Sequence, residues 1–478
     1  MAWIWAVISV ITFLYLLQEL LTLNKNKKLP PGPKALPIIG HFHLLGKNPH
    51  HDLHHLAKKY GPIIYLRFGF VHTIVISSPA AAELVLKTRD LVFAGRPYHQ
   101  AAKHLSYDQK NIVFSPYGTY WRNMRKLCTL ELLSNLKINQ FRPMRRTEIA
   151  CLVSCLKQAA EQRETVDMSA RVLALSGDMT CLMVFGRKFV DGDLDEKGFK
   201  AVIEEALEVA ALPNLGDYFP FMGVLDLQGL TRRMKELSKI FDGFLERIID
   251  DHARKREEKK EDQDFVDTMM RIMVLDLLIG GMDTSAAAIE WALSELIRHP
   301  KVMQKLQKEL EQVVGMDQTV EEPHLDKLNY LNLVIKETLR VHPVVPLLIH
   351  ETIEDCTIDR FHISKGSRVI VNVWSIGKDP KVWQDPEKFE PERFVGSNID
   401  LRGQDFELIP FGSGRRGCPG MQLGLTVVRL VVAQLVHCFD WDLPNEMVAN
   451  DLDMGEHFGL VTGREKHLMA IPTYRLSK

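Results

Sequence analysis

One ten-residue stretch constrains this chain more than any other: Phe411-Gly-Ser-Gly-Arg-Arg-Gly-Cys-Pro-Gly420, followed by an apolar run over residues 421–439. The apolar run predicts a buried helix, so Cys418 closes a Gly-rich loop just before a helix N-terminus. Glycines let the backbone approach a flat, bulky group closely, and the helix dipole favours a thiolate. A buried structural cysteine in a Gly-rich turn is the alternative.

Five positions of this stretch follow the pattern Phe-x-x-Gly-x-Arg-x-Cys-x-Gly: Phe411, Gly414, Arg416, Cys418 and Gly420. An anionic sulfur, a close flat approach and a cation for a propionate are what a thiolate-ligated haem requires. Chance matches to so many positions are rare, and the stretch resembles the haem loop of the cytochrome P450 family. The resemblance implies a mainly α fold with small β-sheets, and haem b with Cys418 as the axial ligand of the iron.

The composition sets limits on the remaining possibilities. The 478 residues are 46% hydrophobic and 25% charged, as in an ordinary globular protein. The formal charge of −1 leaves no basic footprint for nucleic acid. Seven cysteines without a Cys-x-x-Cys pair argue against a disulfide framework or a structural zinc module, and indicate a reducing compartment.

The N-terminal residues 2–23 are predicted to form an uncleaved membrane anchor. Residues 2–17 carry no charge, and neither a positive leading region nor a small-x-small cleavage site is present. The lysines follow the apolar run, which places the rest of the chain in the cytosol. Residues 24–37 form a basic, Pro-rich hinge similar to that of microsomal P450s. The resemblance implies a single-pass protein of the endoplasmic reticulum membrane, with a catalytic domain over 38–478.

Two further groups are candidates for the haem propionates. Trp121 and Arg125 are four residues apart on a predicted helix, so an indole N–H and a guanidinium share one face. Simple packing would explain such a face equally well, but the pair resembles the propionate-binding pair of the family. His350 falls where the family often places a cation for the second propionate.

An apolar helix predicted over residues 274–299 contains Gly280-Gly-Met-Asp-Thr-Ser285. Glycine inside a helix costs about 1 kcal/mol relative to alanine, so the pair Gly280 and Gly281 indicates packing or function, such as a wall of a substrate pocket. Asp283 and Thr284 are an acid beside an alcohol, the parts of a short proton relay. Hydroxyl bonding back to the preceding turn is the alternative. The segment resembles the oxygen-activating helix of the family.

Glu337 and Arg340, three apart on a predicted helix, have no specificity by themselves. With Arg393 they resemble the buried Glu-Arg-Arg network of the family, a structural brace for the cysteine loop. The extended segment after this helix and a loop near the C-terminus are expected to line the substrate pocket with Val345, Ile349 and Leu460. Hairpins are predicted over 63–78 and over 357–374, the second with its turn at Lys365-Gly366.

His50, His51, His54 and His55 form two i,i+4 pairs that could ligate a metal. They lack the His-Glu-x-x-His pattern, so polar positions on a surface helix are the preferred interpretation.

The resemblance implies a monooxygenase that hydroxylates a small lipophilic plant secondary metabolite, a phenolic or terpenoid. No nicotinamide or flavin fingerprint is visible, so electrons from NADPH are expected through a separate cytochrome P450 reductase, which would dock at Arg122 and Lys126. The alternatives are a reductase-independent haem-thiolate isomerase or dehydratase, and a non-catalytic haem-binding variant. The last alternative arises because the chain lacks roughly twenty residues near 268–273 that related chains carry.

Overall fold

The computed structural model describes residues 28–188, 199–255 and 263–477, with isolated positions 3, 5, 9, 10 and 13 before them. The anchor expected over residues 2–23 therefore falls almost entirely outside the described residues, as does the start of the hinge. The described part of the hinge packs on the domain. Tyr65 N–H donates to the Pro31 carbonyl at 2.9 Å, and an added Cβ on Gly32 would lie 2.2 Å from the Tyr65 oxygen.

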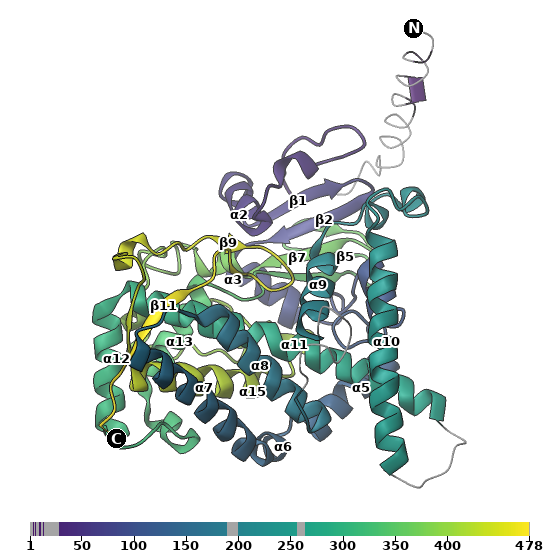
Figure 1. Ribbon diagram of the computed structural model, residues 1–478. Helices are drawn as coiled ribbons and strands as arrows, with labels where there is room; N and C mark the ends of the chain where they lie inside the picture. The colour runs from purple at the N-terminus through teal and green to yellow at the C-terminus, as the bar shows by residue number, and fades with distance from the viewer. Residues whose placement is uncertain are drawn as a thin grey trace.

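Helices make up most of the molecule, as expected from the sequence (Figure 1). The first are α2 (Pro49–Tyr60), α3 (Pro79–Glu83), α4 (Gln100–Leu105), α5 (Thr119–Leu127) and α6 (Asn135–Gln140). The central ones are α7 (Arg142–Gln162), α8 (Met168–Phe185), α9 (Phe199–Ala211), α10 (Leu230–Lys255) and α11 (Gln263–Arg298). The last are α12 (Pro300–Val313), α13 (Asn329–Val341), α14 (Val373–Gly377) and α15 (Met421–Cys438).

The largest sheet has four strands in the order β1-β2-β7-β4. They are β1 (Ile63–Phe68), β2 (Val71–Ile76), β7 (Arg368–Asn372) and β4 (Leu347–Glu351). β2 and β7 are parallel and the other neighbours antiparallel. A second sheet joins β3 (Val166–Asp167), β11 (Met469–Tyr474) and β8 (Phe439–Asp442). The remaining strands pair as β5 (Cys356–Ile358) with β6 (Phe361–Ile363), and β9 (Glu456–His457) with β10 (Gly463–Arg464).

The hairpin predicted over 63–78 is confirmed as β1 and β2. For the hairpin predicted over 357–374, the turn at Lys365-Gly366 is confirmed, because Ser367 N–H donates to the Ser364 carbonyl at 3.1 Å. The predicted strand pairing is wrong, because β5 pairs with β6 and the chain reverses between Ile358 and Phe361. β7 instead enters the large sheet between β2 and β4, and all five of its residues are buried. A strand covered on both faces loses the alternation that reveals a hairpin partner in the sequence.

α11 is the central element and lies against α8, α13 and α15. Its alanines at 286–288 and 292 are buried in the largest core cluster, where small side chains let the neighbouring helices approach. By length and composition, α8, residues Ile272–Arg298 of α11, and α15 could each cross a membrane. All three contribute buried residues to this core, so burial inside the protein accounts for their apolar character.

Candidate active site

Cys418 lies between a short 3-10 turn, η8 (Gly414–Arg416), and the start of α15. Its N–H donates to the Phe411 carbonyl at 2.9 Å, which closes the loop. The N–H groups of Gly420 and Met421 point at the sulfur, as the helix N-terminus predicts. The side chain stays accessible although protein surrounds it, so the sulfur faces an internal recess.

The acidity of Cys418 differs from the expectation. Burial raises the pKa of the thiol, and the N–H of Gly420, the charge of Arg125 and the N–H of Met421 only partly offset this. The helix N-terminus therefore does not make a thiolate by itself. A cation bound to the sulfur would do so, because a metal deprotonates a coordinating thiol outright.

The glycines of the loop have different tasks. Gly414 has a φ of +64°, and an added Cβ would lie 2.0 Å from the Leu86 carbonyl oxygen, so it serves a close approach between backbones. Added Cβ atoms at Gly280 on α11 and at Gly424 on α15 would meet nothing within 4 Å. These two open positions lie on α11 and α15, which pack against each other, and α15 begins just after the cysteine loop, where a flat group needs room.

Arg416 is held close to Trp121 below the loop. Its guanidinium donates to the carbonyls of Ala94 at 2.8 Å and Ser115 at 2.7 Å, and stacks 4.3 Å from the centre of the Trp121 ring. Trp121 Nε1–H donates to the Ile112 carbonyl at 3.0 Å. The indole predicted to bind a propionate is thus bonded to backbone, and it acts here as a platform for the arginine.

Arg96 is a member of this cluster that sequence reasoning missed. Its guanidinium donates to the carbonyls of Val113 and Ile349. Burial lowers the pKa of Arg96 to about 10. The pKa of Arg416 is lowered to about 9, mainly by burial and further by repulsion from Arg96 and Arg125. The position of Arg96 between Gly95 and Pro97, in a segment without a clear period, gave little warning of this role.

His350 lies beside these arginines but on the buried side of β4. It is 4% exposed, whereas its neighbour Ile349 is 42% exposed, because successive strand residues face opposite ways. Its Nδ1 lies 2.8 Å from the Phe93 carbonyl. Burial, with Arg96 adding to it, holds the pKa of His350 well below its ordinary value. The chain alone therefore presents a neutral imidazole at this place, and Arg96 is the stronger cation.

These residues fit an iron porphyrin on their own chemistry. Across the described ranges, Arg96, Arg125 and Arg416 form no ion pair with any carboxylate, although all three guanidinium groups are at least partly buried. Three such cations near one sulfur suit a flat ligand with two carboxylates. Cys418 would ligate the iron, and the three arginines would bind the propionates.

On α11 the two adjacent glycines prove to be unlike. An added Cβ at Gly281 would lie 3.1 Å from Thr180 Oγ1, and Ser176 Oγ donates to the Gly281 carbonyl at 3.0 Å. Gly281 therefore serves the contact with α8 and not the pocket wall predicted for it. Gly280 is the glycine of this pair at which an added Cβ would meet nothing within 4 Å.

Thr284 donates its hydroxyl to the Gly280 carbonyl at 2.7 Å. This is the back-bonding that the sequence left open, and it leaves the lone pairs of the hydroxyl oxygen available to accept. Asp283, the next residue on the helix, is half-buried.

The Glu-Arg-Arg residues meet in one buried network. Glu337 accepts two bonds from Arg340, at 2.7 and 2.8 Å, and one from Arg393 at 2.9 Å. Arg340 also donates to the carbonyls of residues 377, 386 and 388, and Arg393 to those of 384, 385 and 388. The network therefore holds the irregular segment that leads to the cysteine loop.

The predicted pocket residues come from two segments that touch. Thr462 N–H donates to the Val344 carbonyl at 2.8 Å, which places the loop of Leu460 against the segment of Val345. Trp291 of α11 donates to the Thr462 carbonyl at 3.1 Å. Val345 and Leu460 are both half-buried.

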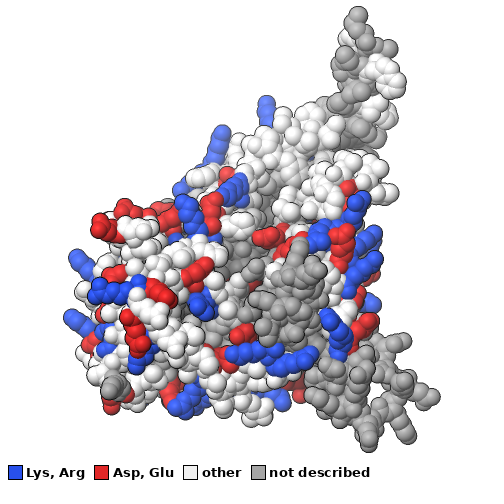
Figure 2. All heavy atoms as spheres, in the orientation of Figure 1, with Lys and Arg blue, Asp and Glu red and all other residues white. Residues whose placement is uncertain are grey.

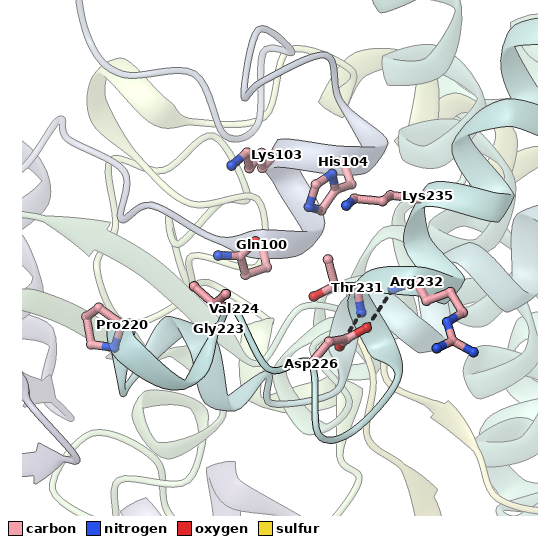
Figure 3. A pocket seen from close by; sticks show the side chains of 10 residues that line it. All are labelled: Gln100, Lys103, His104, Pro220, Gly223, Val224, Asp226, Thr231, Arg232 and Lys235. Carbon is pink, nitrogen blue, oxygen red and sulfur yellow. Dashed lines mark hydrogen bonds between the residues drawn. The ribbon is translucent and has the colours of Figure 1, made fainter.

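A separate pocket of about 500 Å³ opens between α4 and the start of α10 (Figure 3). Lys103, His104 and Lys235 come from its two sides, while Asp226 is bonded to the N–H groups of Thr231 and Arg232. None of its lining residues belongs to the cysteine loop.

Comparison with known proteins agrees with this geometry. The family model "Cytochrome P450" matches residues 30–469. Cytochrome P450 CYP736A12 of Panax ginseng is 50% identical over 478 residues, covering 95% of both chains. Flavonoid 3'-monooxygenase CYP75B137 of Crocosmia x crocosmiiflora is 40% identical, covering 94% of this chain and 93% of that one. Strychnine-11-hydroxylase of Strychnos nux-vomica is also 40% identical, with 92% and 90% covered. A matching loop, a matching network and these relatives lead to one conclusion: the chain belongs to the cytochrome P450 family and is a monooxygenase of the plant type.

Proposed function

We propose that the protein hydroxylates a small lipophilic plant metabolite, phenolic or terpenoid, with electrons that a separate NADPH-dependent reductase delivers. The observation that carries this is the accessible Cys418 sulfur beside three arginines that lack acidic partners in the described chain. The chemistry that haem supplies when bound is the reductive activation of dioxygen.

The residues of the chain have four tasks in this reaction. Cys418 ligates the iron, and the N–H groups of Gly420 and Met421 bond its sulfur and thereby tune the potential. Arg96, Arg125 and Arg416 bind and orient the propionates. The apolar side chains of Val345, Ile349 and Leu460 exclude water and bind a lipophilic substrate. Val345 and Leu460 are half-buried and Ile349 is exposed, as suits side chains that line a surface open to a ligand.

Protons reach the reaction through α11. The Thr284 hydroxyl oxygen holds a proton that it donates to the Gly280 carbonyl, and it accepts a new donor through its lone pairs. Asp283, beside it, is the group that exchanges protons with solvent. A reductase-independent isomerase has no need of such a relay, and no feature of the site favours that alternative.

The reductase is proposed to dock at α5. Arg122 and Lys126 are exposed on this helix, whose buried residues Trp121 and Met124 face the site. A pair of exposed cations suits an acidic partner surface. The charge reversals Arg122→Glu and Lys126→Glu are expected to raise the reductase concentration needed for half-maximal turnover.

We also propose attachment to the endoplasmic reticulum membrane through residues 2–23, with a second contact beside it. Exposed apolar side chains gather on the β1–β2 turn and the loop before α10: Phe70, Phe221, Val224, Leu225 and Leu227. The Phe70 and Phe221 rings are 5.6 Å apart, so the two segments form one patch. The upper end of the molecule is largely uncharged on the face in Figure 2, whereas both signs mix elsewhere. Lys103 and Lys235 of the pocket in Figure 3 lie at the border of this patch and suit lipid headgroups.

The shortened region near 268–273 bears on whether this function is retained. α11 runs without interruption from Gln263, and Ile272, Leu275 and Leu278 are buried in apolar clusters. We propose that the remaining chain folds and binds haem despite the shorter connection.

The test is the absorbance spectrum of the expressed, reduced protein with carbon monoxide. The band of a thiolate-ligated haem is expected, and Cys418→Ser is expected to lose it. A histidine-type band in the wild type would contradict the assignment of Cys418. Loss of haem from the wild type would contradict the folding of the shortened chain. Substrate then follows from screening phenolics and terpenoids for NADPH-dependent hydroxylation with reductase.

A further inference from the structure

Outside the cysteine site, histidines and carboxylates from separate parts of the chain meet in one place. His50 and His51 come from the first turn of α2, and Glu456 comes from β9. His50 Nε2 lies 2.7 Å and His51 Nε2 lies 2.9 Å from the same carboxylate oxygen, Glu456 Oε2. The three ligand atoms all lie within 4.8 Å of one another. α2 and β9 are also neighbours in Figure 1.

Hydrogen bonding leaves this cluster incompletely satisfied. His50 is fully buried, and within the described chain its Nδ1 has no hydrogen-bond partner. His51 Nε2 is also without a bond in that part of the chain, because its N–H is not aligned with the oxygen 2.9 Å away. Two imidazole nitrogens thus converge on one oxygen, and only one of them donates to it. Of the two nitrogens that lack a bond in the described chain, only His51 Nε2 faces Glu456, so it is the buried nitrogen that a ligand placed between the three side chains would bond.

A second layer of contacts fixes the geometry of the carboxylate. The other oxygen of Glu456 lies 3.8 Å from His342 Nδ1. His342 Nε2 is 2.6 Å from Glu295 Oε1, and its ring stacks 4.0 Å from that of Trp291. Such a chain of carboxylate and imidazole is the kind of support that orients metal ligands.

Aromatic rings hold the two histidines in place. The Trp374 ring lies 4.2 Å from that of His51 and 5.7 Å from that of His50. The Phe458 ring stacks on His50 at 5.4 Å. The Trp374 and Phe458 rings therefore restrict the movement of the two histidines. The cluster is nearest to solvent at His51, whose side chain is 33% exposed.

We propose that His50 Nε2, His51 Nε2 and Glu456 Oε2 bind a zinc ion, with a water as the fourth ligand. Two histidines, one glutamate and a water are an established donor set for this ion. Zinc bonds of about 2.0–2.2 Å place tetrahedral ligand atoms about 3.3 Å apart. The N···O distances of 2.7 and 2.9 Å must therefore widen by about half an ångström. A shift of the Glu456 carboxylate would widen the distance to His50, and rotation of the partly exposed His51 ring would widen the other. The ion takes the place of the proton at each Nε2, and both imidazoles remain neutral with their one proton on Nδ1.

The ion would join the two ends of the chain. α2 lies near the N-terminus, and β9 leads directly into the loop that carries Leu460 and Thr462. A bound zinc would hold this loop against the large sheet. The site uses no residue of the cysteine loop, so it stands apart from the haem chemistry.

The test is zinc binding to the full chain, purified in detergent after treatment with a chelator and dialysis. Isothermal titration is expected to give one zinc per chain, and cobalt(II) a visible spectrum of tetrahedral intensity. His51→Gln removes one ligand from the exposed edge and is expected to weaken binding at least about tenfold. His55→Gln is the matched control, since His55 lies exposed on the same helix outside the cluster, and it is expected to bind like the wild type.

Equal zinc binding by the wild type and His51→Gln would overturn the proposal, and so would the absence of a stoichiometric site in the wild type. A thermal transition of metal-free His51→Gln that matches the metal-free wild type excludes misfolding. Should His51→Gln not fold, Glu456→Gln replaces it, because the amide keeps the shape of the carboxylate. Unchanged binding by Glu456→Gln would likewise refute the site.

Discussion

Glu337→Gln tests the buried network of Glu337, Arg340 and Arg393, which bonds the backbone between residues 377 and 390. The carboxylate and both arginine side chains are almost completely buried, with 0% exposure for Glu337 and Arg340 and 8% for Arg393. Oε1 accepts from Arg340, Arg393 and the Glu390 N–H, while Oε2 accepts from Arg340 Nε. Glutamine keeps one acceptor oxygen, so its NH₂ must face a guanidinium N–H, and two buried cations lose their counter-charge.

Breaking a buried ion pair on one side costs about 3–5 kcal/mol. This is a large fraction of the roughly 5–15 kcal/mol that stabilises a folded domain. With a denaturant slope of about 3 kcal/mol per molar urea, the unfolding midpoint should fall by about 1 M or more. Tryptophan fluorescence is a suitable assay, because Trp383 lies 5.4 Å from the Arg340 guanidinium.

Glu390→Gln is the matched control. Glu390 is 54% exposed and lies 3.6 Å from Arg393, and an exposed pair of this kind is worth about 0–1 kcal/mol. If Glu337→Gln unfolds at the same urea concentration as Glu390→Gln, the network does not stabilise the fold, and the argument from buried charge is refuted.

Three other predictions follow from the site and its surroundings. Gly280→Ala should raise the stability of the haem-free chain by up to about 1 kcal/mol, whereas Gly281→Ala should lower it because the Cβ meets Thr180. Thermal unfolding of both variants measures the difference, and equal changes in their unfolding temperatures would contradict this assignment. Thr284→Ala should lower the amount of product formed per NADPH consumed by about tenfold or more. Hydrogen peroxide, the product of NADPH oxidation without hydroxylation, is measured alongside. An unchanged ratio of product to NADPH would contradict the role of Thr284. Burial, with Lys58 next in effect, lowers the pKa of His54 to about 4. The unfolded chain therefore binds the proton first as pH falls from about 6.5 to 4. Between pH 6.5 and pH 4 the stability of the wild type should therefore decline by at most about 3 kcal/mol. In His54→Gln the urea midpoint should fall less over the same pH range. An identical dependence of the midpoint on pH in the two proteins would contradict this role of His54.

Local patterns predicted the parts of the site that depend on nearby residues. The cysteine loop precedes its helix, and Glu337 and Arg340 share one helix face. Patterns failed where the deciding partner lies far away. Trp121 Nε1 bonds Ile112, whose carbonyl is presented by a loop with no period. Gly280 and Gly281 differ only because α8 passes one of them, about a hundred residues earlier in the chain.

The same limit applies to cations and strands. Arg96 joins the cluster through carbonyls at 113 and 349, which no spacing near residue 96 indicates. β7 pairs with β2, which lies almost three hundred residues earlier. The sequence predicts surface positions for the histidines of α2, yet His50 and His54 are buried because Glu456 and Ser375 reach them from the C-terminal half.

The docking of Thr462 on Val344 and Trp291 has a consequence for biosynthesis. Ribosomes make the cysteine loop and α15 before they make the loop of Leu460 and the strand β11 that anchors it between β3 and β8. The emerging protein thus displays its haem-binding loop while one wall of the site is still unsynthesised. A haem bound at that stage would be enclosed when the last few dozen residues fold against Val344 and Trp291.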